Sequence, residues 1–423
     1  MFKSFQTGKL RFYEFIKELL MGSNLIYRAR RHFKVKAFKK KKEAFLAVES
    51  KGNGGSGVFS QVTYYAIGNA GDTMLSQCVR KTFNHSMKNE RWNIIPVNEE
   101  VTDATVDSIN DGRLLVIGGG GLFLPDTNKN KISGWQWAIS PEQLAQISCP
   151  ICVYSVGYNY FRGQKSSELF ESNLIKLLEK SSFFGLRNTG SIKAIKEIVP
   201  ENLHDRIVFQ PCTTTLIRKL YADTLPAKKT TGKVAINIAL DRPDNRFGEN
   251  KDLILGQIAQ AAKAIADKGY EVYFVAHCGV DNAFIPYLKQ AKAKFKAVDM
   301  SVYYPDKILS FYNQMDVVLG MRGHAQMIPF GLNCEIISLG SHDKMKWFLE
   351  DIDATDWYVE LNSEPEKLKD TIVARFENIH EKNREDTVKR LISQQDRLWD
   401  ITLNNLKTIS QNSDIEFESE ERL

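Results

Sequence analysis

A short apolar run that ends in four consecutive glycines is the feature of this sequence that most constrains its fold. Residues 114–117 are Leu-Leu-Val-Ile, and residues 118–121 are all Gly. An apolar run bounded by turn residues is typical of a buried parallel strand. Glycine backbone can turn sharply and lets a ligand approach its N–H groups. We therefore expect a strand that ends at Ile117 and a ligand loop containing Gly119, Gly120 and Gly121; a plain strand-to-loop corner is the alternative.

The rest of the chain repeats the order of apolar run, turn and helical segment. A first series of such runs occupies residues 60–66, 94–97, 151–156, 183–186 and 207–209. A second series occupies residues 234–238, 271–275, 317–319 and 335–338. Strands that alternate with helices indicate parallel βα units. We predict an α/β protein with two Rossmann-like domains facing a cleft, where ligands of such sheets bind beyond the carboxyl ends of strands.

Length and composition limit the number of domains. The chain has 423 residues, more than one ordinary core holds, and its 43% hydrophobic and 26% charged residues are typical of a soluble globular protein. We predict a basic tail with a Gly-rich linker at 1–57 and an N-terminal Rossmann-like domain at 58–225. A C-terminal Rossmann-like domain at 226–360 and C-terminal helices with an acidic tail at 361–423 complete the expected organisation.

The net charge of +6 is concentrated at the N-terminus. Residues 1–42 contain 13 Lys and Arg and two Glu, a net charge of +11, so the remaining residues carry −5. A basic, partly amphipathic segment within residues 1–50 could lie on an anionic membrane surface. A solvated helix or arm is the alternative. Because no aromatic-and-basic binding module accompanies the tail, we expect no nucleic acid partner.

Other classes of site and location are disfavoured by what the sequence lacks. No apolar run approaches the roughly 20 residues that span a bilayer, and no signal-peptide core follows the basic N-terminus. We therefore expect a cytoplasmic protein, which the tail could hold at the inner face of the cell membrane. The six cysteines are scattered in apolar surroundings, and His, Asp and Glu show no metal-ligand spacing, so we expect buried thiols and no metal.

The first of three strand–loop–helix segments contains Gly68, Asn69, Gly71 and Asp72. Its glycines and Asn permit unusual backbone angles, and the helix that follows presents free N–H groups. This arrangement suits an anionic or hydroxyl-rich ligand. The alternative is that Asp72 only caps the helix.

The other two segments place cations at strand ends. Arg187 follows the apolar run 183–186 and could hold a carboxylate or phosphate in a bidentate fork, although a surface salt bridge is the alternative. Arg322, Gly323 and His324 follow the run 317–319, so that Arg322 and His324 could reach one ligand. His324 could exchange a proton near neutral pH, or it could be a structural histidine.

Taken together, these segments resemble the polysaccharide pyruvyl transferase family. The matching features lie at residues 68–72, 118–121, 155–157, 187–191 and 322–324. Downstream, residues 331–336 and 344–348 resemble that family's order of a glycine, a strand and a lysine before an aromatic residue. The resemblance covers about residues 58 to 350. Gly323 stands where a Leu is usual in the family, and Asn188 where an acidic residue is common.

The resemblance implies a GT-B-like transferase that moves a pyruvyl group from phosphoenolpyruvate to two hydroxyls of a sugar as a ketal. Arg187 and Arg322 would hold the carboxylate and phosphate, and Lys344 would help to hold the phosphate. His324 would be the general acid that protonates the methylene carbon. Asp72 would accept a hydroxyl proton or bind the sugar. No cofactor is implied, since phosphoenolpyruvate is a co-substrate.

The same resemblance implies a role in exopolysaccharide or cell-surface polysaccharide biosynthesis, with a nucleotide sugar or lipid-linked oligosaccharide as acceptor. A homo-oligomer is compatible with it. Two other functions stay open: a GT-B glycosyltransferase that uses a nucleotide sugar, and a non-catalytic sugar- or phosphate-binding scaffold. The departures at Asn188 and Gly323 keep the scaffold open. Trp135, Trp137 and Tyr158 could stack on sugars or pack in the core.

Overall fold

The computed structural model describes residues 58–418 except 65–67, 88–90, 126–130, 162 and 341–342. The basic tail and the Gly-rich linker predicted at 1–57 lie outside the described residues, as does the end of the acidic tail from residue 419. Within the part of the chain that is described, no helix combines the length and the apolar character needed to cross a membrane.

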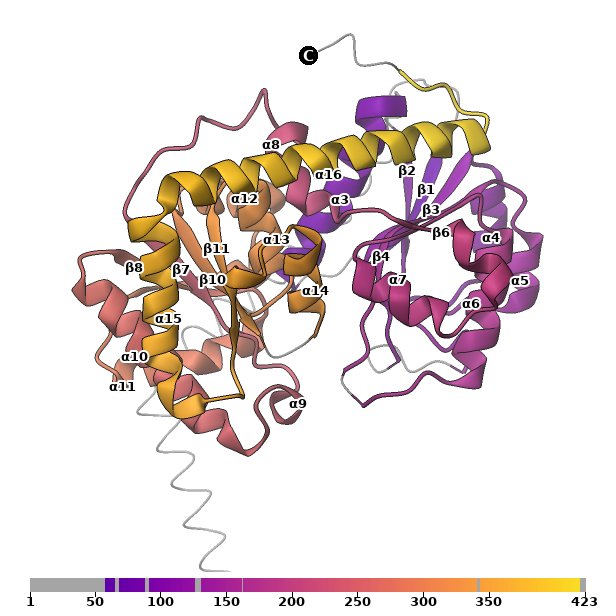
Figure 1. Cartoon of the computed structure of the whole chain (residues 1–423). Helices are drawn as coiled ribbons and strands as arrows, with labels where there is room; N and C mark the ends of the chain where they lie inside the picture. The colour runs from indigo at the N-terminus through magenta and orange to yellow at the C-terminus, as the bar shows by residue number, and fades with distance from the viewer. Residues whose placement is uncertain are drawn as a thin grey trace, which may run out of the picture. The chain divides into compact units, whose positions relative to one another are not determined.

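Two parallel sheets form the framework of the described residues (Figure 1). The first has the order β2-β1-β3-β4-β5-β6. Its strands are β1 (Phe59–Thr63), β2 (Trp92–Pro96), β3 (Leu114–Phe123), β4 (Ile151–Tyr158), β5 (Phe183–Leu186) and β6 (Ile207–Phe209). The second has the order β12-β11-β10-β7-β8-β9. Its strands are β7 (Lys233–Asn237), β8 (Glu271–Ala276), β9 (Lys296–Asp299), β10 (Val317–Gly320), β11 (Glu335–Gly340) and β12 (Tyr358–Glu360).

Helices connect successive parallel strands, as the crossover of a βα unit requires. In the first series they are α3 (Ala70–Met87), α4 (Asp103–Asn110), α5 (Pro141–Gln146), α6 (Glu168–Lys180) and α7 (Thr189–Lys196). The short α8 (Ile217–Leu220) precedes the second series, which contains α9 (Pro243–Phe247), α10 (Lys251–Asp267), α11 (Ile285–Gln290), α12 (Pro305–Tyr312), α13 (His324–Gly331) and α14 (Asp343–Asp351). The chain continues through α15 (Leu368–Phe376) and α16 (Arg384–Asn412). The predicted α/β class with two βα series is confirmed.

The prediction that the third strand ends at Ile117 is wrong, because β3 continues through the four glycines to Phe123. Gly118 pairs with Tyr154 and Gly120 with Val156 of β4, and the register shifts before Phe123. Pairing with a long neighbouring strand outweighs the weak strand preference of glycine. Two strands were also missed: β9 is an edge strand that begins with exposed residues, and β12 has only three residues.

The helix α16 lies along both sheets (Figure 1). In its first half, Gln395 donates a hydrogen bond to the Phe330 carbonyl of α13. In its second half, Asn405 Nδ2 donates to the Phe209 carbonyl of β6 over 2.9 Å, and Asn412 Nδ2 donates to the Ser182 carbonyl over 2.8 Å. The helix thus ties the two sheets together.

Backbone hydrogen bonds attach the start of α3 to the second sheet. The Gly68 N–H donates to the Ser301 carbonyl, and the Ala70 N–H donates to the His277 carbonyl, both over 3.1 Å. Between them, Asn69 forms an isolated antiparallel bridge with Cys278. This loop of the first series is therefore built into the strand ends of the second series, which brings the segments at 68–72 and 322–324 together.

Candidate active site

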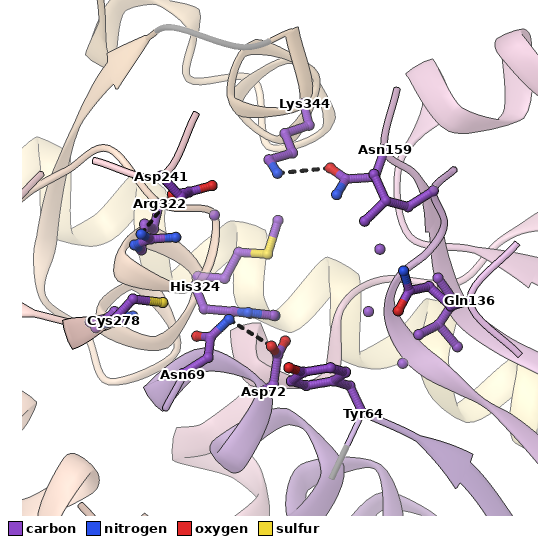
Figure 2. Close-up of a pocket in the computed structure, with 18 of the residues that line it drawn as sticks. Tyr64, Asn69, Asp72, Gln136, Asn159, Asp241, Cys278, Arg322, His324 and Lys344 are labelled. Carbon is purple, nitrogen blue, oxygen red and sulfur yellow. Dashed lines mark hydrogen bonds and ion pairs between the residues drawn. The ribbon is translucent and has the colours of Figure 1, made fainter. Parts of the chain in front are cut away.

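A pocket of about 370 Å³ lies where the strand ends of the two sheets face each other (Figure 2). Ten of the eleven site residues predicted from the sequence line it: Gly68, Asn69, Asp72, Gly119, Gly120, Gly121, Arg187, Arg322, His324 and Lys344. The eleventh, Gly71, is buried directly behind His324. A Cβ at Gly71 would lie 2.5 Å from His324 Nδ1, so only glycine lets α3 and α13 approach this closely.

Arg187 is a buried cation without a counterion in the described residues. Its side chain is 8% exposed and lies against Gly157, where a Cβ would be 2.2 Å from Arg187 Nε. No described residue gives the guanidinium a hydrogen bond or an ion pair, and its Nε is buried without a partner. Burial lowers its pKa, against the opposing effect of Cys212 and Asp72. A buried unpaired charge is costly, so an anion bound beside Arg187 would offset this cost.

Two further buried polar groups near Arg187 have no partner in the described structure. They are Nδ2 of Asn188, the next residue, and Oγ1 of Thr213, which follows the neighbouring strand β6. Most buried polar groups in proteins are hydrogen-bonded, so these two atoms are exceptions, although neither residue lines the pocket. Asn188 also caps α7, since its Oδ1 accepts from the Ser191 N–H over 2.7 Å.

Arg322, in contrast, is bound by two carboxylates. Its Nε and Nη2 donate to the two Asp281 oxygens over 2.8 and 2.5 Å, and Nη2 lies 2.7 Å from Asp241 Oδ1. Burial alone would lower the pKa of Arg322, but Asp281 and Asp241 raise it overall. An incoming anion would have to compete with these two partners.

Asp241 is the centre of an arginine cluster that the sequence reasoning missed. Arg246 Nη2 lies 3.0 Å from its Oδ2 and Arg242 Nη1 lies 3.4 Å from the same oxygen, in addition to Arg322. Burial would raise the Asp241 pKa, but the arginines hold it well below its usual range. The signal was present, because an Asp and two Arg follow the predicted strand at 234–238.

Lys344 reaches across the pocket to the first sheet. Its Nζ donates to Oδ1 of Asn159, which follows β4, over 2.7 Å (Figure 2). Burial, Arg246 and Arg187 lower the pKa of Lys344 well below its usual range, and Asp241 opposes them. Like charges thus face one another in the ligand-free pocket, and an anion would relieve their repulsion.

His324 is the first residue of α13, and its Nε2 lies 3.8 Å from Cys212 Sγ. Burial lowers its pKa to about 3, with further contributions from Arg187 and Lys344. The imidazole of the ligand-free protein is therefore neutral near pH 7. A role as general acid requires a ligand whose negative charge offsets these two cations.

Asp72 lies in the first turn of α3, beside His324 in the pocket (Figure 2). Asn69 Nδ2 donates to Asp72 Oδ2 over 2.6 Å, while Asn69 Oδ1 accepts from the Gly71 N–H at the helix start. Asn69, and not Asp72, therefore satisfies this free N–H. Burial raises the pKa of Asp72 to about 6, although Arg187, Arg322 and Lys344 lower it. The carboxyl can thus hold or release a proton near neutral pH.

The aromatic residues considered for sugar stacking do not line the pocket. Trp135 and Trp137 are buried in the apolar core of the first sheet, which confirms core packing for both. Tyr158 stacks on Tyr160 with ring centroids 4.4 Å apart. Gln136 and Tyr64 line the pocket instead. Among the described residues, no group of three or more His, Cys, Asp or Glu side chains is arranged to hold a metal ion.

Solved structures share this fold at low sequence identity. A Listeria monocytogenes protein named as a UDP-N-acetylglucosamine 2-epimerase superposes with a TM-score of 0.52 at 9% identity, covering 87% of this chain and 100% of that chain. The structure of S. aureus MnaA with UDP superposes with a TM-score of 0.48 at 9% identity, covering 80% of this chain and 91% of that chain. The Neisseria meningitidis UDP-GlcNAc 2-epimerase bound to UDP-GlcNAc superposes with a TM-score of 0.47 at 11% identity, covering 84% of this chain and 98% of that chain. The first of these supports the fold alone, which is GT-B-like.

Sequence comparison identifies the family. None of the curated proteins compared with the chain matches it. The family model for polysaccharide pyruvyl transferase matches residues 69–343, more than half of the 423 residues. The match begins at Asn69 and ends one residue before Lys344, so it contains the residues that line the pocket except Tyr64, Gly68 and Lys344. The chain therefore belongs to the polysaccharide pyruvyl transferase family and is a transferase with a GT-B-like fold.

Proposed function

We propose that this protein transfers a pyruvyl group from phosphoenolpyruvate to two hydroxyls of a sugar, in exopolysaccharide or cell-surface polysaccharide biosynthesis. Family membership supports pyruvyl transfer in general. The observation that supports phosphoenolpyruvate as the donor is the buried guanidinium of Arg187, which has no counterion among the described residues. Phosphoenolpyruvate has a carboxylate and a phosphate, and an arginine fork fits either group.

Lys344 is the second cation that we assign to the donor. It is within electrostatic reach of Arg187, and burial and like charges lower its pKa in the ligand-free pocket. A phosphate beside Lys344 would favour its charged form and relieve that repulsion. Arg322 contributes to the electrostatic field of the pocket, but its ion pairs with Asp281 and Asp241 make it a weaker candidate for direct anion binding.

Proton transfer in this scheme starts at His324. The donor offsets Arg187 and Lys344, two of the groups that lower the His324 pKa, so donor binding favours the imidazolium. The imidazolium then gives its proton to the methylene carbon, and C2 becomes cationic. A sugar hydroxyl adds to C2 and loses its proton to Asp72. Phosphate leaves as its bond to C2 breaks and takes up the proton held by Asp72, which regenerates the carboxylate. The second hydroxyl then adds to C2 to close the ketal, and its proton returns to His324.

The scheme is tested by phosphate release from phosphoenolpyruvate in the presence of nucleotide sugars or lipid-linked oligosaccharides. We expect release to depend on an acceptor and to fall at least about a hundredfold in His324→Ala, because a positioned acid contributes about that much or more. His204→Ala is the matched control, since His204 does not line the pocket and contacts the Val199 carbonyl. Absence of release with every acceptor, together with tight nucleotide-sugar binding, would favour a GT-B glycosyltransferase.

The charge of His324 gives a second prediction, which needs no acceptor. In the ligand-free protein the His324 imidazole should not titrate between pH 5 and 8, because its pKa lies at about 3. Saturating phosphoenolpyruvate should raise this pKa by more than one unit, since the ligand offsets Arg187 and Lys344. Two-dimensional NMR of 15N-labelled imidazoles, assigned with His324→Ala, measures both states. An unchanged pKa in the complex would argue against an acid role.

The acceptor and the cellular location belong to the same proposal. A nucleotide sugar or a lipid-linked oligosaccharide would supply the two hydroxyls. A lipid-linked acceptor would explain a basic segment in residues 1–50, which would hold the protein at the cytoplasmic face of an anionic membrane.

A further inference from the structure

Outside the pocket, the helices α7 and α14 of the two series are in direct contact. Thr189 begins α7, and its N–H lies 3.2 and 3.3 Å from the two carboxylate oxygens of Asp351, the last residue of α14. The Thr189 hydroxyl also donates to Asp351 Oδ1 over 2.5 Å. A carboxylate from one βα series thus satisfies a free N–H at the helix start of the other.

A second contact lies one helical turn earlier on α14. Trp347 lies against Gly190 of α7, where a Cβ would be 2.0 Å from Trp347 Cδ2. Because Trp347 and Asp351 are four residues apart, both project from the same face of α14. Arg397 of α16 holds the end of α14 by donating to the Asp351 carbonyl. We call Thr189, Gly190, Trp347 and Asp351 the α7–α14 clasp.

The clasp connects the two cations assigned to the donor. Lys344 is in the first turn of α14, three residues before Trp347, and therefore near the same face of the helix. Arg187 lies only two residues before Thr189, the first residue of α7. We propose that the clasp positions Lys344 against Arg187 across the pocket, so that both cations reach one anionic donor. This inference rests on the proposed function.

Two mild substitutions test the clasp. Thr189→Val removes the hydroxyl that donates to Asp351, and Gly190→Ala forces Trp347 away from α7. We expect each to weaken phosphoenolpyruvate binding at least tenfold in calorimetry and to increase hydrogen exchange of residues 343–351. Thr189→Ser keeps the hydroxyl and should bind phosphoenolpyruvate as the wild type does. Gly256→Ala on α10 is the matched glycine control, because a Cβ there meets no atom within 4 Å.

A double-mutant cycle separates positioning from general loosening of the fold. If the clasp acts through Lys344, Gly190→Ala should lose most of its effect on binding in a Lys344→Ala background. The proposal is overturned if the effect of Gly190→Ala is the same in both backgrounds, or if both clasp variants bind phosphoenolpyruvate as the wild type does. A wild-type protein that does not bind phosphoenolpyruvate would overturn the proposed function. In that case, faster hydrogen exchange of residues 343–351 in the clasp variants would still support the α7–α14 contact, and unchanged exchange would overturn it.

Discussion

Replacing Arg187 by Met should strongly weaken donor binding and make the folded protein more stable. The guanidinium is buried without a counterion among the described residues, so its removal relieves an unsatisfied group that costs about 1 to 3 kcal/mol. The same change removes charge-assisted hydrogen bonds to the donor, which should weaken binding about a hundredfold or more. Calorimetric titration with phosphoenolpyruvate and urea unfolding of the ligand-free protein measure the two effects.

Arg322→Met is the internal contrast, because this arginine lines the same pocket but is paired. Its loss would leave Asp281 buried without its cation, and breaking a buried ion pair costs about 3 to 5 kcal/mol. The two variants should therefore change unfolding free energy in opposite directions. If Arg187→Met were destabilised as strongly as Arg322→Met, Arg187 would be a structural residue and the donor site would lie elsewhere.

The location of the pocket could be predicted from the sequence because parallel sheets impose it. Each segment chosen from the sequence follows or ends a strand, and the carboxyl ends of parallel strands meet at one edge of a sheet. That rule places Arg187 after β5 and His324 after β10 without any knowledge of side-chain contacts. Applied to β7, it would also have found Asp241 and Arg246, which were missed although a strand was predicted there.

The pairing of these residues could not be predicted in the same way. Nothing in the local sequence distinguishes Arg322, held by Asp281 and Asp241, from Arg187, which has no described counterion. Asp281 lies 41 residues and Asp241 lies 81 residues before Arg322, and these segments meet only in the folded chain. The need for glycine at position 71 could not be predicted either. It arises because His324, which belongs to the other βα series, lies too close to leave room for a Cβ.

Asp72→Asn should lower acceptor-dependent phosphate release about 10² to 10⁴-fold while leaving donor binding within a few-fold of wild type. Burial raises the Asp72 pKa to about 6, so at pH 7 to 8 the carboxylate is available to accept a hydroxyl proton. Asn has the same shape and can still accept the hydrogen bond from Asn69 Nδ2, but it cannot take a proton. Asp370→Asn, on the exposed side of α15, is the matched control for activity.

The same substitution should change how stability depends on pH. The Asp72 pKa is about 6 in the folded protein and near 3.8 in the unfolded chain. Between these two values, the folded state therefore keeps a proton that the unfolded state has released. Stability of the wild type therefore falls as pH rises through this window, and Asp72→Asn removes that loss. Relative to the wild type, the variant should gain about 1 kcal/mol in unfolding free energy between pH 5 and pH 8. A difference that does not vary with pH would mean that Asp72 is already ionised at pH 5, and its proton-accepting role would then have to be explained by position alone.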